Sequence, residues 1–266
     1  MLGLSAVTII TIFLFFIAGA AIGSFLNVVI ERTHQRQSFW QGRSFCNHCN
    51  HQLAWYDLIP LLSFLSLGAK CRYCRKALTW QYFFLELLTG LGFVALWWRF
   101  AAEGYGILAF WLFLFSFLVV IFVYDLKYQY IYDRFSLPAI ALAFIAQIVW
   151  QPLTWWQFAL GGLVGAGIYL GLYYLSGGKD IGGGDIRLGA LLGFLVGLKS
   201  LLYVLLYSYL IAVLVLLIYY LAKRKKIKYL PLGPFLISGL MLYVFFPEVT
   251  VKLIDSGFGK IVDFLI

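Results

Sequence analysis

Charged residues are scarce in this sequence. They make up 12% of the 266 residues, whereas hydrophobic residues make up 63%. A soluble globular domain typically has about 25% charged residues. The composition, together with a mean hydropathy of +0.92, therefore excludes an ordinary soluble domain. It predicts a protein whose chain crosses a membrane several times.

Other absences narrow the class further. The amino terminus lacks the basic segment of a secretory signal peptide, and its apolar run is longer than a signal-peptide core, so we expect a retained membrane helix. No Gly-x-Gly-x-x-Gly sequence follows a strand-like segment, so no glycine-rich cofactor-binding motif is recognisable. The sequence also has no internal repeat and no low-complexity segment.

The hydrophobic runs predict an all-α polytopic membrane protein with about eight transmembrane helices. One crossing needs about 20 apolar residues. The run from Ile186 to Leu221 is longer than that, so a break is expected at residues 197–200. The other spans are expected at residues 4–30, 81–98, 106–124, 135–150, 156–175 and 231–246. The fifth span carries five glycines that suit close helix packing, namely Gly161, Gly162, Gly165, Gly167 and Gly171.

Four divisions of the chain are expected. They are a first transmembrane helix (1–31), a small cytoplasmic four-cysteine domain (32–80), a transmembrane core (81–247) and an external amphipathic tail (248–266). Residues 32–80 form the one polar stretch large enough to be a small domain.

The basic residues predict the orientation. The net charge of +9 could suggest a nucleic-acid partner, but the lysines and arginines gather in particular loops, which is typical of topology determinants. With both termini outside, the inside loops hold Arg32, Arg36, Arg43, Lys70, Arg72, Arg75, Lys76, Lys127, Arg134, Lys179, Arg187 and the cluster at 223–228. We therefore expect a lipid bilayer, and no nucleic acid, as the surroundings of this protein.

All four cysteines lie in the first polar loop. Cys46-x-x-Cys49 and Cys71-x-x-Cys74 are separated by 21 residues, a spacing typical of a zinc ribbon in which each pair supplies two thiolates to one tetrahedral ion. The predicted site is a structural zinc site, because four thiolates leave no open position for catalysis. His48 and His51 are spare candidate ligands, although exposed polar side chains are the plainer interpretation. The alternative for the cysteines is four incidental thiols.

A pair of aspartates is the candidate catalytic site. Asp185 follows the glycines Gly182, Gly183 and Gly184 at the start of a hydrophobic run, and Asp125 ends an earlier run. Carboxylates at the ends of membrane helices need a partner or a function, and the glycines permit positive φ and leave room for another chain. The predicted orientation brings both aspartates to the cytoplasmic side. The alternative is that they pair separately with Lys127 and Arg187.

Three other acids lie near this pair or in the spans. Glu86, within the second span, is either a substrate-binding or helix-pairing group or a glutamate paired with a nearby arginine. Asp133 and Asp180 are loop residues that we expect to cap helices or face water.

Several motifs together resemble the type IV prepilin peptidases. They are Gly23-Ser-Phe-Leu-Asn-Val-Val-Ile-Glu-Arg32, which contains Asn27, the two Cys-x-x-Cys pairs, Leu53-Ala-Trp-Tyr-Asp-Leu-Ile-Pro-Leu-Leu-Ser-Phe64, Glu86-Leu-Leu-Thr-Gly90 and Gly182-x-Gly-Asp185. Two positions depart from the family pattern: Arg187 stands where lysine is common, and Ile131-Tyr132 precedes Asp133 where Ile-Pro is usual.

The resemblance implies a membrane aspartic endopeptidase with Asp125 and Asp185 as its catalytic pair. Members cut the leader peptides of prepilins and pseudopilins after a glycine at the cytoplasmic membrane face, and many also methylate the new amino terminus with S-adenosylmethionine. Asn27, Glu86 and Arg187 are candidate supporting residues.

Two alternative functions come from other classes. One is a related Gly-x-Gly-Asp membrane protease with other substrates. The other is a non-enzymatic membrane transporter with a zinc-ribbon docking domain. The position of the aspartates at helix ends disfavours a transporter, because coupling acids usually lie near the middle of the bilayer.

Overall fold

The computed structural model describes residues 5–179, 181–224 and 230–247. Within these ranges the chain is helical, with two isolated β-bridges and no β-strand. Six of the described helices are long and apolar enough to cross a membrane. The all-α membrane architecture expected from the sequence is therefore confirmed. The expected tail at 248–266, Asp180 and most of the basic cluster at 223–228 lie outside the described residues.

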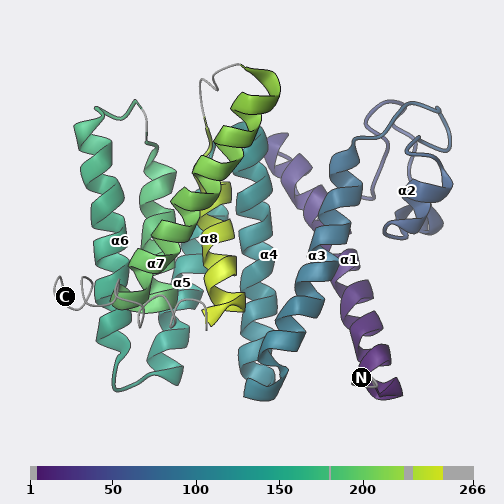
Figure 1. Cartoon of the computed structure of the whole chain (residues 1–266). Coiled ribbons are helices and arrows are strands. Elements are labelled where there is room, and N and C mark those ends of the chain that lie inside the picture. The colour runs from purple at the N-terminus through teal and green to yellow at the C-terminus, as the bar shows by residue number, and fades with distance from the viewer. Residues whose placement is uncertain (1–4, 180, 225–229, 248–266) are drawn as a thin grey trace. The chain divides into compact units, whose positions relative to one another are not determined.

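The helices follow the expected hydrophobic runs (Figure 1). They are α1 (Ala6–His34), α2 (Leu62–Ser66), α3 (Trp80–Phe100), α4 (Tyr105–Tyr128), α5 (Asp133–Trp150), α6 (Trp155–Leu175), α7 (Gly183–Lys223) and α8 (Gly233–Phe245), with 3-10 turns at Trp55–Leu58 and Ala101–Glu103. One boundary differs in a way that matters for function. The expected third span ends at residue 124, whereas α4 continues through Tyr128 and holds Asp125 in its last turn.

The chain divides into two compact units, unit 1 (residues 1–120) and unit 2 (residues 121–266). In unit 1, α1 packs against α3. A Cβ on Gly23 would lie 2.9 Å from Cα of Glu86, and one on Gly19 would lie 2.8 Å from Cβ of Phe93. The small residues of α1 therefore let the two helices approach closely, as in other membrane helix pairs.

In unit 2, α6 and α7 meet along a line of glycines. Gly161, Gly162 and Gly165 of α6 are buried, and a Cβ on any of them would collide with α7. Gly165 faces Gly189, and Gly161 faces Gly193. The expected close packing is therefore confirmed for these three positions. It does not extend to Gly167 and Gly171, where a Cβ would meet nothing within 4 Å.

The long helix α7 consists of two antiparallel halves joined at Gly197, whose φ of 77° and ψ of 173° are not helical. Gly165 of α6 lies beside both Gly189 in the first half and Leu201 in the second. One turn further along α6, Tyr169 contacts Gly189 again, and its hydroxyl lies 3.3 Å from that of Tyr209.

From Gly161 to Gly165 along α6, the facing residue in the first half of α7 moves back from Gly193 to Gly189. In the second half it moves forward from Leu198 to Leu201. The chain reverses at Gly197, within the break that the sequence predicts, and α7 supplies two of the expected spans. A positive φ combined with a ψ near 180° is essentially confined to glycine.

Helix α8 completes the expected set of eight helical segments. It packs on the second half of α7: Tyr243 donates a hydrogen bond to Ser200 (2.8 Å), and Gly239 lies against Val204 and Ser208. Later residues of α8 thus face earlier residues of α7, so the two segments are antiparallel. With 13 residues, α8 is shorter than the about 20 residues of a full crossing.

Candidate functional sites

Asp125 and Asp185 lie close together in unit 2. Asp125 is buried, at 5% exposure, and its Oδ2 accepts a hydrogen bond of 3.0 Å from the N–H of Gly233, the first residue of α8. The position of a Cβ on Gly233 is also 3.3 Å from the side chain of Leu188, which is one turn along α7 from Asp185. Asp185 is near enough for its charge to act on the carboxyl group of Asp125. The fold thus brings the end of α4 and the starts of α7 and α8 to one place.

Asp185 is held by its own helix start. Its Oδ2 accepts a hydrogen bond of 3.0 Å from the N–H of Gly182, and its N–H donates to the carbonyl of Gly182. A carboxylate in the first turn of a helix also interacts favourably with the helix dipole. Each of the two aspartates therefore accepts one N–H from a glycine at a helix start.

The three glycines before Asp185 act differently from the expectation. Gly182 has a φ of −88°, and none of the three has a positive φ; the left-handed glycines lie earlier, at Gly177 and Gly178. Gly184 is instead required by packing, because its Cβ would lie 2.6 Å from that of Ile131. At Gly183 a Cβ would meet nothing within 4 Å, so one side of this turn is open.

Arg187 does not neutralise Asp185. It forms an ion pair with Asp133 at the start of α5, and both side chains are partly exposed. Arg187 is therefore not the separate partner of Asp185 that the alternative interpretation expects. It also gives Asp133 a structural partner on α7.

The four cysteines form a cluster that could hold a metal ion. The Sγ atoms of Cys46, Cys49, Cys71 and Cys74 all lie within 4.8 Å of one another, and those of Cys46 and Cys74 are 3.9 Å apart. A tetrahedral ion with bonds of about 2.3 Å to sulfur places the sulfurs about 3.8 Å apart. In the described residues no histidine belongs to this cluster, and both His48 and His51 are exposed.

The two Cys-x-x-Cys turns have the same backbone structure. In the first, the N–H of Cys46 donates to His51 and the N–H of Asn50 to Cys46; in the second, Cys71 donates to Lys76 and Arg75 to Cys71. Asn50 and Arg75, each following the second cysteine of its pair, have φ values of 55° and 59°. The repeated turn points two sulfurs from each pair to the same place.

The thiols do not ionise equally. Burial opposes ionisation of Cys46, but hydrogen bonds from the N–H groups of His48 and Cys49 and from the thiols of Cys71 and Cys49 outweigh it and lower its pKa to about 7. For Cys49 the N–H of His51 acts to lower the pKa, but burial and the neighbouring thiols of Cys46 and Cys74 raise it to about 11. A divalent cation among the four sulfurs would offset this mutual repulsion.

Asp57 connects the second Cys-x-x-Cys turn to the chain between the two cysteine pairs. Its carboxylate accepts hydrogen bonds from Arg72 Nε (2.7 Å), Tyr73 Oη (3.0 Å) and the N–H of Ala54 (3.2 Å). Burial acts to raise the pKa of Asp57, but these donors outweigh it and lower the pKa below its ordinary value. The sequence indicates no role for this residue, although it lies in a motif that carries the resemblance.

Arg32 and Glu86 anchor the cysteine loop to the helices of unit 1. The buried guanidinium of Arg32 donates to four loop carbonyls, those of Ser38, Gln41, Gly42 and Arg43. The buried carboxylate of Glu86 accepts the N–H of Leu61 at 2.8 Å, where the backbone φ is 60°. The sequence predicts neither role. It places Arg32 among the basic residues of the inside loops and in the first motif of the resemblance, and it pairs Glu86 with a substrate, another helix or an arginine.

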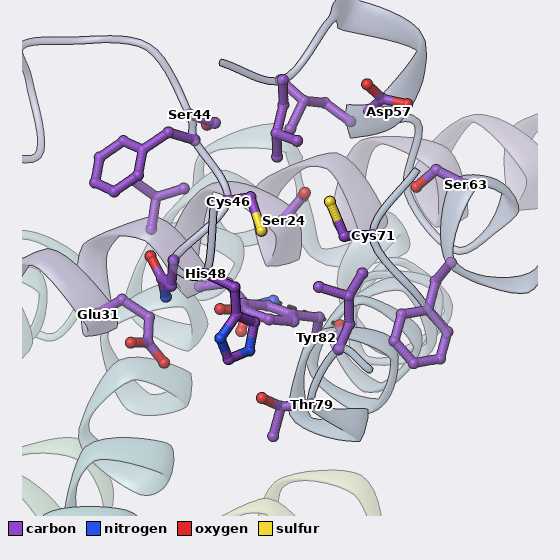
Figure 2. A pocket seen from close by; sticks show the side chains of 18 of the residues that line it. Ser24, Glu31, Ser44, Cys46, His48, Asp57, Ser63, Cys71, Thr79 and Tyr82 are labelled. Carbon is purple, nitrogen blue, oxygen red and sulfur yellow. Dashed lines mark hydrogen bonds between the residues drawn. The ribbon is translucent and has the colours of Figure 1, made fainter. Parts of the chain in front are cut away.

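A pocket of about 210 Å³ lies between the cysteine loop and the ends of α1 and α3 that adjoin it. Figure 2 shows Glu31, Cys46, His48 and Tyr82 around it. Asn27 also lines it and is buried, with hydrogen bonds of 3.4 Å to the carbonyl of Tyr82 and from Gln81. The supporting residues Asn27 and Glu86 thus belong to this pocket in unit 1, whereas Arg187 belongs to unit 2.

These features define a class: a helical, multi-span membrane protein with a carboxylate pair at helix ends and a four-cysteine loop. Residues 17–100 match the family model described as the Bacterial Peptidase A24 N-terminal domain, and residues 112–218 match the Type IV leader peptidase family. The chain belongs to this family, which confirms the resemblance.

The names of similar curated proteins agree with this family. The prepilin leader peptidase/N-methyltransferase of Vibrio cholerae is 31% identical over 87% of this chain and 95% of its own length. The protein of the same name from Bacillus subtilis is 32% identical over 85% and 91%. The type 4 prepilin-like proteins leader peptide-processing enzyme of Escherichia coli is 33% identical over 84% and 89%. No solved structure gives a match.

Proposed function

We propose that this protein is a membrane aspartic endopeptidase that removes leader peptides from type IV prepilin-like proteins. Its substrates would be prepilin or pseudopilin precursors, cut after a glycine at the cytoplasmic face of the plasma membrane. The observation that carries the proposal is the proximity of Asp125 and Asp185, two acids that lie 60 residues apart in the sequence. Membership of the family argues against the transporter alternative.

The chemistry follows from the carboxylate pair. Two nearby carboxylates share one proton at moderate pH, because like charges this close cannot both ionise easily. The ionised acid takes a proton from a water molecule as this attacks the peptide carbonyl, and the protonated acid donates to the carbonyl oxygen. The open side of Gly183 would leave room for an extended substrate backbone.

Cleavage of a prepilin-like substrate in detergent by single variants tests this mechanism. Asp125→Asn and Asp185→Asn should each abolish cleavage while the protein stays folded, because an amide cannot hold or accept the shared proton. The double variant should be scarcely worse than either single variant, since the two acids act as a unit.

Asp133→Asn is the matched control. It removes a partly exposed ion pair with Arg187, a type of interaction worth about 0–1 kcal/mol, and should keep most activity. Normal cleavage by Asp125→Asn together with an inactive Asp133→Asn would show that Asp133, and not Asp125, is the first acid. Normal cleavage by all of these variants would exclude an aspartic peptidase.

Zinc is the metal that best suits the four cysteines. Four thiolates with tetrahedral spacing match the ligand type and geometry of a structural zinc site. Cys46, Cys49, Cys71 and Cys74 would hold the ion, and the zinc would stabilise the loop without taking part in hydrolysis.

The names of the relatives also support amino-terminal methylation with S-adenosylmethionine. That cofactor supplies an electrophilic methyl group, and its positive charges suit carboxylates. Glu31 and Glu86 line the pocket of unit 1 and would face such charges there. The mass of the cleaved product, measured with and without the cofactor, tests this second activity.

The orientation is proposed from the distribution of basic residues. The active site and the cysteine loop would be cytoplasmic, because basic loops resist translocation. Reporter fusions after Arg75 and Lys228 should behave as cytoplasmic, and a fusion after Trp150 as external. An external signal from the fusion after Arg75 would contradict this arrangement.

A further inference from the structure

The start of α8 lies directly against Asp125, although the two are 108 residues apart. The N–H of Gly233 donates to Oδ2 of Asp125 at 3.0 Å. The first N–H groups of a helix have no partner within the helix, and the next residue, Pro234, has no N–H. Gly233 therefore offers a free donor at the positive end of a helix dipole, and the buried carboxylate uses it.

The missing side chain of Gly233 matters as much as its N–H. A Cβ at this position would lie 2.6 Å from Oδ2 of Asp125 and 3.3 Å from Cδ1 of Leu188. The closest atom is thus the end of the Asp125 side chain, which can rotate away. A methyl group at residue 233 would therefore cost the fold little and would displace the carboxylate itself.

We propose that Gly233 is a positioning residue for Asp125, an inference that rests on the proposed peptidase function. Its N–H holds one carboxylate oxygen, and its lack of a Cβ admits that oxygen to the helix start. Gly182 holds Oδ2 of Asp185 at the same distance, 3.0 Å. The two glycines thereby fix the orientation of both carboxylates, and a displacement of about 1 Å in such a site can cost about 100-fold in rate.

Two glycines of the same helix make a matched test. At Gly239 a Cβ would lie 2.7 Å from the backbone N of Ser208 and 2.7 Å from the carbonyl oxygen of Val204, atoms that cannot rotate away. Gly233→Ala should lower kcat for a prepilin-like substrate by about 100-fold, with KM and Tm near those of the wild type. Gly239→Ala should lower Tm, with kcat per folded molecule unchanged. A kcat for Gly233→Ala within twofold of the wild type would overturn the proposal.

A double-mutant cycle covers the case in which Gly233→Ala also lowers Tm. If the destabilisation comes from the clash with the carboxylate, adding Asp125→Ala should restore most of the lost Tm, because coupling between neighbouring residues is non-additive. Equal destabilisation with and without the carboxylate would overturn the proposal. Failure of the proposed function would look different: Asp125→Asn would cleave normally, while the stability coupling of Gly233 and Asp125 would still be present.

Discussion

The two units are stabilised by different kinds of interaction. The cysteine loop of unit 1 is held by directional polar contacts: a cluster of four sulfurs, the carbonyls gathered by Arg32, and the carboxylates of Asp57 and Glu86. The helices of unit 2 are held by close backbone packing along glycines of α6 and α7. A short polar loop has too little apolar surface for a core, whereas helices in a membrane gain most from close approach.

This difference predicts how a single substitution affects the stability of each unit. Loss of one ligand should affect the whole cysteine loop, because metal binding and folding of a small loop are coupled. Loss of one small residue in the helical unit should have a graded effect on stability.

The largest effect should come from Cys46→Ser. Purified wild-type protein should contain one zinc per chain, and the variant should contain almost none. Residues 32–80 should become sensitive to protease, because a metal bound there would supply the stability that the small loop lacks. Limited proteolysis and metal analysis measure both results. A wild-type protein with no zinc and four free thiols would show that the cysteines are not a zinc site.

A smaller, graded effect should come from Gly165→Ala in the contact between α6 and α7. The new methyl group would collide with the backbone of Gly189, and overpacking of this kind costs about 1–3 kcal/mol. The Tm in detergent should fall. Gly167→Ala is the control on the same helix, because its Cβ meets nothing within 4 Å. Equal Tm values for the two variants would contradict the packing described here.

The smallest effect should come from acid titration of Asp57. Its pKa is lowered in the folded protein, so its contribution to stability is present above its unfolded pKa of about 3.9 and is lost as the pH falls through the folded value. Arg72 is partly exposed, so the contribution is modest. Wild type and Asp57→Asn should differ in protease resistance of the loop at pH 6, and this difference should shrink towards pH 3. A constant difference across this range would exclude the assigned role of Asp57.

Properties that depend on neighbouring residues were predicted correctly from the sequence. The lengths of the hydrophobic runs predicted the helices, the run from Ile186 predicted a break near Gly197, and the Cys-x-x-Cys spacing predicted the four-sulfur cluster. Run length, residue spacing and turn formation are local, so they can be inferred without knowing how the helices pack. Helix α4 continues four residues beyond the expected span 106–124, because polarity at Asp125 does not by itself terminate a helix.

Only the tertiary structure decided which distant groups meet. Arg187 could have paired with Asp185 as its near neighbour, but the packing of α5 beside α7 gives it Asp133 instead. Likewise, nothing in the sequence around Gly233 indicates that its N–H holds Asp125. Such contacts join residues on separate helices, so they depend on helix packing and rotation, whereas residue spacing along one chain segment constrains only neighbours.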